Sequence, residues 1–371
     1  MKIKFYFFLI SLFSINCFAQ KQQVEQFYVG TYTSQGSEGI YLCDFNSNTG
    51  EIGLNQVFSG INNPNFLKIS PDRKTLYAVT MLTPGGEADG FAEAYHIGEG
   101  GRLDFINRQD SKGANPCHVD VSPDGKIVGV ATYGSGTTSL YPVTGDGGLL
   151  PASSTVVNKG SGADPSRQSA PHAHSVRFYG EGDYIFSADL GTDRVDIFKV
   201  DNLKHEPAAQ KCLKLPPGSG PRHFDFHPDG DVIYVINELN STITSYIRKN
   251  KKWDLLQTIR TLPEDFKEVN YCADIHVSSD GRYLYGSNRG HNSIAVFSID
   301  PSSKKMEWKG FVSCRGDWPR NFSFSPDQRF MLVANQKSGN IVVYRINRAN
   351  GIPEFTGHEL KIPSAVCIEF L

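Results

Sequence analysis

The chain has 371 residues, of which 39% are hydrophobic and 20% are charged, and its formal net charge is -2 at pH 7. This composition is typical of a globular protein with a sizeable core, and the charge gives no reason to expect nucleic acid or an anionic membrane as a partner. The 36 glycines and 20 prolines indicate frequent turns, and 24 Phe and 16 Tyr against 4 Met favour strands over helices.

The first 19 residues have the pattern of a targeting segment. Two lysines supply positive charge at the start, an apolar run follows that is too short to span a bilayer, and Cys17 and Ala19 are small residues suited to a cleavage site before Gln20. We therefore expect residues 1–19 to be a signal peptide and the mature protein to be periplasmic or secreted, with no membrane span. Lipid anchoring through Cys17 is the alternative, but residues 14–16 lack the leucine and small residue of a lipobox.

A sequence repeat begins near residue 64 and predicts the architecture. Each copy consists of a short segment that usually contains proline, an apolar strand, a turn of the Ser-Pro-Asp-Gly type and a second strand. Proline and aspartate suit the first positions of a type I turn and glycine ends it, so each copy is a hairpin and not a βαβ unit. The copies cover residues 64–81, 116–133, 171–190, 221–238, 272–289 and 319–336, with a truncated copy at 363–371.

The copies start roughly 44 to 55 residues apart, which is typical of four-stranded propeller blades. The last copy lacks its later strands, and two spare strands at residues 27–32 and 39–45 supply them. We therefore predict an all-β fold, a seven-bladed β-propeller closed by pairing of the N- and C-terminal strands, with one domain from residue 24 to 371. Such closure removes exposed sheet edges.

Six cysteines remain after Cys17, about one per repeat, and most lie within apolar strand patterns. This placement favours buried free thiols over disulfides. The sequence has no CxxC or HExxH spacing, so we expect no Cys/His metal site and no cofactor.

Superposition of the copies on their turn glycine aligns several charged residues. Arg222 aligns with His174 and Arg320 at the start of the first strand, and Glu238 aligns with Arg289 at the end of the second. The start of one strand and the end of its antiparallel neighbour lie on the same rim. We therefore predict that these side chains gather on one sector of one mouth of the central channel.

Several motifs resemble the lactonase family typified by the bacterial propeller 6-phosphogluconolactonase, which the fungal carboxy-muconate lactonising enzyme also resembles. They are YVGTY, PCHV, PHAHSV, DLGTDRV, GPRHFDFHPDG, INELNST and SNRGHNSIAVF, and the resemblance extends over nearly the whole mature chain. The resemblance implies a lactonase whose site is built from His174, Arg222, Glu238 and Arg289. Family members that act on 6-phosphogluconolactone work inside the cell, so the expected export signal leaves open whether the lactone is phosphorylated.

These residue types suit lactone hydrolysis, which needs a base for water, positive charge for the oxyanion and a proton donor for the ring oxygen. Glu238 or His174 could be the base, and Arg222 and Arg289 could hold the oxyanion or a substrate anion. Candidate substrate-binding residues near the same rim or just below it are His118, His172, His223, His276 and Arg320.

We therefore expect a monomeric, metal-independent lactonase that hydrolyses a sugar-type lactone, with that small molecule as its partner. One alternative is a lactonising isomerase that binds a muconate-like diacid through the same arginines. The other is a non-catalytic binding propeller, which would have no need of this charged cluster and would instead show an exposed apolar or aromatic patch.

Overall fold

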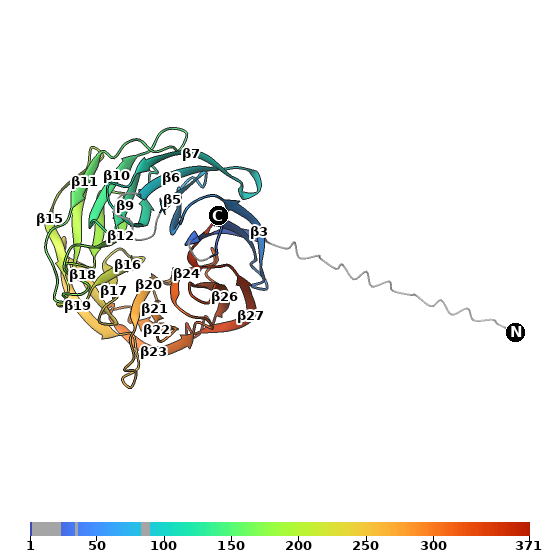
Figure 1. The fold of residues 1–371 in the computed structure, drawn as a ribbon. Coiled ribbons are helices and arrows are strands. Elements are labelled where there is room, and N and C mark those ends of the chain that lie inside the picture. Colours follow the sequence, from blue (N-terminus) through green and yellow to red (C-terminus); the bar gives the residue numbers. More distant parts are fainter. Residues whose placement is uncertain (2–23, 34–35, 83–89) are drawn as a thin grey trace.

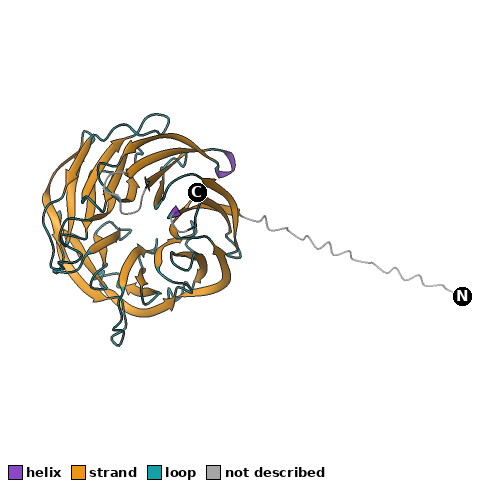
Figure 2. Ribbon diagram, in the orientation of Figure 1, coloured by secondary structure: helices purple, strands orange, loops and turns teal. Residues whose placement is uncertain are grey.

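The computed structural model describes Met1 and residues 24–33, 36–82 and 90–371. The expected signal peptide therefore lies outside the described residues, apart from Met1. The described chain forms seven antiparallel sheets of four strands each, arranged in a ring around a central channel (Figure 1). Strands supply almost all of its regular structure, alongside a short 3-10 helix at Glu99–Gly101 (Figure 2). The prediction of an all-β, seven-bladed propeller is confirmed.

Six blades are continuous in sequence, and each runs from its innermost strand at the channel to its outermost strand at the periphery. The first two consist of β4 (Phe66–Ile69), β5 (Thr75–Met81), β6 (Gly90–Ile97) and β7 (Leu103–Asp110), then β8 (Pro116–Val121), β9 (Ile127–Thr132), β10 (Thr137–Pro142) and β11 (Ser154–Val157). The next two consist of β12 (Ala173–Tyr179), β13 (Tyr184–Asp189), β14 (Arg194–Asp201) and β15 (Lys204–Lys214), then β16 (Pro221–Phe226), β17 (Val232–Asn237), β18 (Thr242–Lys249) and β19 (Lys252–Arg260). The last two consist of β20 (Tyr271–Val277), β21 (Tyr283–Arg289), β22 (Ser293–Ile299) and β23 (Met306–Ser313), then β24 (Pro319–Phe324), β25 (Phe330–Asn335), β26 (Asn340–Ile346) and β27 (Pro353–Lys361).

The seventh blade joins the two ends of the chain. Its strand order is β28 (Ala365–Phe370), β1 (Val24–Thr31), β2 (Gly39–Asn46) and β3 (Ile52–Ser59), so the C-terminal strand is innermost. Phe27 pairs with Phe370, and Gly30 pairs with Cys367. The blue and red ends of the chain accordingly meet in one blade in Figure 1. Closure by pairing of the N- and C-terminal strands is confirmed.

In four blades a serine and an aspartate of the repeated turn hold the hairpin as the sequence predicts. In the second blade the Asp124 carboxylate accepts hydrogen bonds from the Ser122 hydroxyl (2.7 Å) and the Lys126 backbone N–H (3.1 Å). Gly125 takes a φ of 72°, a left-handed conformation that costs glycine little. These local bonds fix the register of the two inner strands.

Five of the innermost strands share a β-bulge close to their start. The register shifts in β8, β12, β16, β20 and β24. A bulge leaves its extra residue outside the ladder and redirects that side chain. The residues at the shifts are Cys117, His174, Arg222, Ala273 with Asp274, and Arg320. In these five blades the backbone thus presents unpaired residues at the same end of the channel.

All six cysteines of the described chain are free thiols, and five of them are buried. Cys17 lies outside the described residues. Burial raises the pKa of Cys117 and of Cys43 to about 12, so these two thiols stay protonated and unreactive at neutral pH.

Candidate active site

A cavity of about 540 Å³, called here the site cavity, lies at the end of the channel where the innermost strands begin. Its charged and imidazole side chains come from four blades and one long connection: Arg167, His174, Glu238, Arg289 and Arg320. Its aromatic walls are Tyr32, Tyr133, Tyr271 and Trp318. A concave, partly aromatic cavity with converging charges is the usual form of a small-molecule site.

Glu238 is the anchor of the site cavity. It directly follows β17, and its backbone N–H donates to the carbonyl of Gly220 (2.7 Å). Arg167 donates to its Oε1 (2.6 Å), and Arg289 donates to its Oε2 (2.7 Å). Arg222 forms an ion pair with Oε2 through Nε (3.2 Å). Both carboxylate oxygens are therefore already engaged by guanidinium groups.

This environment determines the charge of Glu238. The side chain is only 7% exposed, and burial alone would raise its pKa. The nearby positive charges of Arg289, Arg222 and Arg167 outweigh burial and lower the pKa of Glu238 from 4.5 to about 2. Glu238 is therefore ionised at neutral pH and is a weak base.

Arg222 lies beneath the site cavity and is fully buried. Its Nη1 donates to the carbonyl of Ala273 in the next blade (2.6 Å). Burial, followed by the like charges of Arg289 and Arg320, lowers the pKa of Arg222 to about 9, which leaves the guanidinium protonated at neutral pH. Arg222 thus ties the fourth and fifth blades together behind Glu238.

Arg289 and Arg320 present their charges to the cavity differently. Arg289 donates to the backbone carbonyls of Cys272 (2.9 Å) and Tyr271 (3.2 Å), so it is fixed on several sides. Arg320 hydrogen-bonds the Tyr32 hydroxyl (3.1 Å), and no carboxylate of the described residues lies within ion-pair distance of it. Three arginines therefore pair with Glu238 and a fourth, Arg320, adds its charge nearby, so the site has an excess of positive charge that suits an anionic ligand or a developing oxyanion.

His174 occupies the bulge of β12 and is 5% exposed. Its Nδ1 lies 3.9 Å from the Sγ of Cys117. Burial lowers the pKa of His174 well below 6.5, and the charge of Arg222 lowers it further. The imidazole is therefore neutral at neutral pH and retains a lone pair.

The other predicted histidines lie outside the site cavity. His172 stacks on Tyr133 with ring centroids 4.3 Å apart, and its Nδ1 donates to the Tyr133 carbonyl (2.8 Å). His118, His223 and His276 line a second cavity of about 100 Å³, called here the inner cavity. Its walls come from residues further along the innermost strands, so it lies deeper in the channel. The structure therefore brings together His174, Glu238, Arg289 and Arg320, places Arg222 directly beneath them, and separates the remaining four histidines.

Arg167 is a cavity residue that repeat analysis missed. It lies in residues 158–172, the connection between β11 and β12. The Asp164 carboxylate accepts the backbone N–H groups of Ser166 (2.8 Å) and Arg167 (3.2 Å), which shapes the turn. The sequence feature that could have indicated this residue is the length of the connection. It is longer than two neighbouring blades need to be joined, and it leads directly into the PHAH motif.

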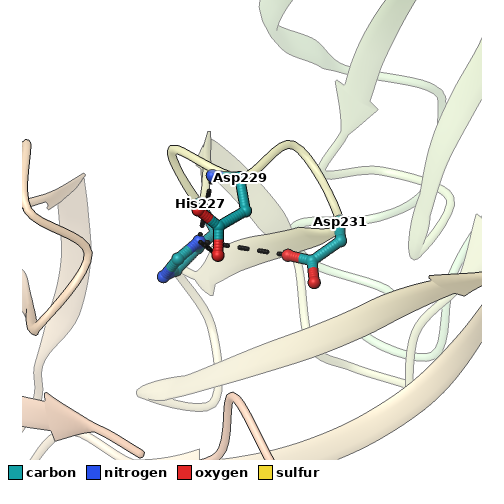
Figure 3. A group of neighbouring side chains, drawn as sticks. All are labelled: His227, Asp229 and Asp231. Atoms are coloured by element: carbon teal, nitrogen blue, oxygen red, sulfur yellow. Dashed lines mark hydrogen bonds and ion pairs between the residues drawn. The ribbon is translucent and has the colours of Figure 1, made fainter. Parts of the chain in front are cut away.

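Three ligand-type side chains meet elsewhere, at the turn that follows β16. Figure 3 shows His227, Asp229 and Asp231, the one group of this kind within metal-binding distance in the described parts of the chain. The His227 Nδ1 accepts the Asp229 backbone N–H (3.1 Å), and Lys304 pairs with the Asp229 carboxylate. The Nδ1 lone pair of His227 and the carboxylate of Asp229 are thus already engaged within the protein. This turn lies at the opposite end of β16 from Arg222.

The chain is similar to known proteins over nearly its whole length. A family model described as "Lactonase, 7-bladed beta-propeller" matches residues 26–370. The chain is 33% identical over 348 residues to a 6-phosphogluconolactonase of Bacillus subtilis, covering 93% of this chain and 97% of the relative. It is 38% identical over 327 residues to a 6-phosphogluconolactonase of Formosa agariphila, covering 86% of this chain and 91% of the relative.

Solved structures agree with the sequence comparisons. The periplasmic gluconolactonase of Pseudomonas aeruginosa matches with a TM-score of 0.88 and 32% identity, covering 94% of this chain and 99% of that chain. The family match spans every blade that contributes a charged side chain to the site cavity.

Proposed function

Because the chain belongs to the lactonase family of seven-bladed β-propellers, we propose that it hydrolyses the ring ester of a sugar-type lactone in the site cavity. The observation that carries the proposal is the arginine cluster, defined as Arg167, Arg222 and Arg289 held around the ionised Glu238. Such a cluster offers fixed positive charge where ester hydrolysis develops negative charge.

Glu238 acts in this proposal as the anchor of the arginine cluster. A carboxylate whose pKa is about 2 takes a proton from water poorly, and both of its oxygens already accept from arginines. Its negative charge instead fixes the directions of the guanidinium planes. This preorganisation lowers the cost of arranging donors when the oxyanion forms.

His174 acts as the base. It carries the one imidazole among the described residues that line the site cavity, and its lowered pKa keeps it unprotonated at neutral pH. A lactone is an activated ester, so a modest base suffices. Arg320, which has no carboxylate partner in the described chain, supplies positive charge for the oxyanion or for an anionic group of the substrate.

The reaction balances with these groups alone. His174 accepts one proton of the attacking water while the water oxygen bonds to the carbonyl carbon. The ring C–O bond then breaks, and the ring oxygen takes the second proton of the water and becomes a hydroxyl. The former carbonyl group leaves as a carboxylate and His174 gives up its proton, so each turnover releases one proton and one hydroxy-carboxylate.

The proposal is tested by pH-stat titration of the purified mature protein with glucono-δ-lactone and with its 6-phosphorylated form. Spontaneous hydrolysis in matched blanks is subtracted. We expect enzymatic acid release with at least one of these lactones, and a large loss of rate in His174→Gln. Absence of hydrolysis above the blank with sugar lactones would refute the proposal. The ratio of the two rates reports whether the phosphate is recognised.

We also propose that the protein is exported, with residues 1–19 removed, and works as a monomer. A periplasmic gluconolactonase is among the similar structures, and the N-terminal sequence pattern has the features of a signal peptide. In the described part of the chain, no helix has the length and apolar character needed to cross a bilayer.

A further inference from the structure

The inner cavity lies directly behind the base of the proposed reaction. His174 lines the site cavity, while His118 and His223 line the inner cavity. The rings of His174 and His223 meet edge to face with centroids 5.4 Å apart, and those of His223 and His118 meet with centroids 5.2 Å apart. A layer of imidazoles therefore separates the two cavities along the channel.

His223 has an unused nitrogen in this layer. The residue is 5% exposed, and its Nδ1 donates to the Oδ1 of Asp274 (2.7 Å). Its Nε2 is buried and has no hydrogen-bond partner among the described protein groups. Because buried polar atoms are nearly always satisfied, a lone pair left open beside a polar cavity points to a role with water or a proton.

Asp274 fixes that arrangement. Besides His223, its carboxylate accepts hydrogen bonds from His276 Nε2 (3.1 Å), Asn321 Nδ2 (2.6 Å) and the Phe322 backbone N–H (3.2 Å). Burial would raise the pKa of Asp274, but His276 and His223 hold it well below 3.8. An ionised Asp274 keeps the His223 proton on Nδ1, which leaves the lone pair on Nε2.

The electrostatics of the two cavities differ. A proton on His174 is unfavourable because Arg222 and Arg320 are close, and Glu238 already binds arginines. The inner cavity instead has three carboxylates, those of Asp120, Asp274 and Glu369, against the two cations Lys68 and Arg177. The site cavity has three arginines against the one carboxylate of Glu238. The His276 side chain on its wall is 31% exposed, so the inner cavity has a route to solvent. Transfer of a proton from His174 to the inner cavity is therefore electrostatically favourable, because the proton moves away from the arginines of the site cavity.

We propose that His223, held by Asp274, relays the proton from His174 into the inner cavity during lactone hydrolysis. The inference rests on the proposed function. The proton enters at Nε2 of His223 while the Nδ1 proton stays in its hydrogen bond to Asp274. The same Nε2 then releases a proton to water in the inner cavity on the side of His276, which restores the starting tautomer. The charged and titratable groups around His223 are Arg222 on its own strand, His118 on β8, His174 on β12, and Asp274 and His276 on β20.

The test compares His223→Gln with wild type in weakly buffered solution. Glutamine keeps a side-chain donor for Asp274 but cannot carry a proton through its amide. We expect kcat to fall roughly tenfold or more with KM unchanged. Added imidazole should restore most of the loss in the variant and leave wild type unaffected. The control is His227→Gln, which changes a buried histidine outside the channel and should keep the wild-type kcat.

A wild-type kcat in His223→Gln, or a loss that imidazole does not restore, would overturn the relay. If His223→Gln does not fold, the rate of the wild-type enzyme in mixtures of H₂O and D₂O decides. A curved dependence on the deuterium fraction supports transfer of more than one proton, and a linear dependence overturns it. Failure of the proposed function looks different, because the wild-type protein would then hydrolyse no lactone.

Discussion

Glu238→Gln separates an anchoring carboxylate from a catalytic base. The substitution keeps the shape of the side chain and removes its charge, so the arginine cluster loses its shared counterion. The Gln carbonyl can still accept from one arginine, but its amide N–H₂ group faces another guanidinium. We expect a protein that folds, is less stable, and binds substrate poorly.

The size of the effect follows from the pKa of Glu238. A pKa lowered from 4.5 to about 2 corresponds to about 3 kcal/mol of preference for the ionised form in the folded protein. Unfolding entropy for about 350 residues is roughly 0.7 kcal/mol per degree near the melting temperature, so the loss should lower Tm by about 4 °C.

The stability difference should also depend on pH with a definite sign. The folded-state pKa of Glu238 lies below its unfolded value, so its stabilising effect is complete above about pH 5 and is lost as pH falls toward 2. Urea unfolding at several pH values should therefore show a full gap between wild type and Glu238→Gln at pH 7 that narrows between pH 5 and pH 3.

Kinetics supply the decisive assay. We expect Glu238→Gln to raise KM for the lactone and to keep kcat within about tenfold, whereas His174→Gln should lower kcat by roughly two to four orders of magnitude. The reasoning would be refuted if Glu238→Gln lost more than a hundredfold in kcat while KM and melting stayed at wild-type values. Glu238 would then be the base.

Four further predictions use simpler measurements. Arg320→Ala should raise KM more for a phosphorylated lactone than for the neutral sugar lactone, and an equal rise for both would argue against an anion contact. Deletion of residues 363–371 should open the seventh blade and cause aggregation in size-exclusion chromatography; a monomeric variant with wild-type melting would contradict closure as the source of stability. Dialysis against a strong chelator should leave the rate unchanged, and a loss that calcium restores would require a metal. N-terminal sequencing of the exported protein should identify Gln20 as its first residue. Finding Met1 or a lipidated Cys17 there would contradict removal of residues 1–19.

The repeat made much of this protein predictable. Aspartate in the turns, proline in most of them and a similar spacing between the copies were enough to predict blades, their number and the closing pair of strands. Because each copy places equivalent residues at equivalent heights, alignment of Glu238 with Arg289, and of Arg222 with His174 and Arg320, was enough to place them at one end of the channel.

The roles of those residues depended on the tertiary structure. Glu238 has its pKa set by three arginines that lie 16 to 71 positions away in sequence, and one of them, Arg167, belongs to no repeat. The repeat register also could not show the β-bulges that redirect His174 and Arg222, nor the division of the histidines between two cavities. A repeat determines where each residue lies along its strand, whereas charge and proton affinity depend on distances between side chains of different blades, and only the closed ring sets those distances.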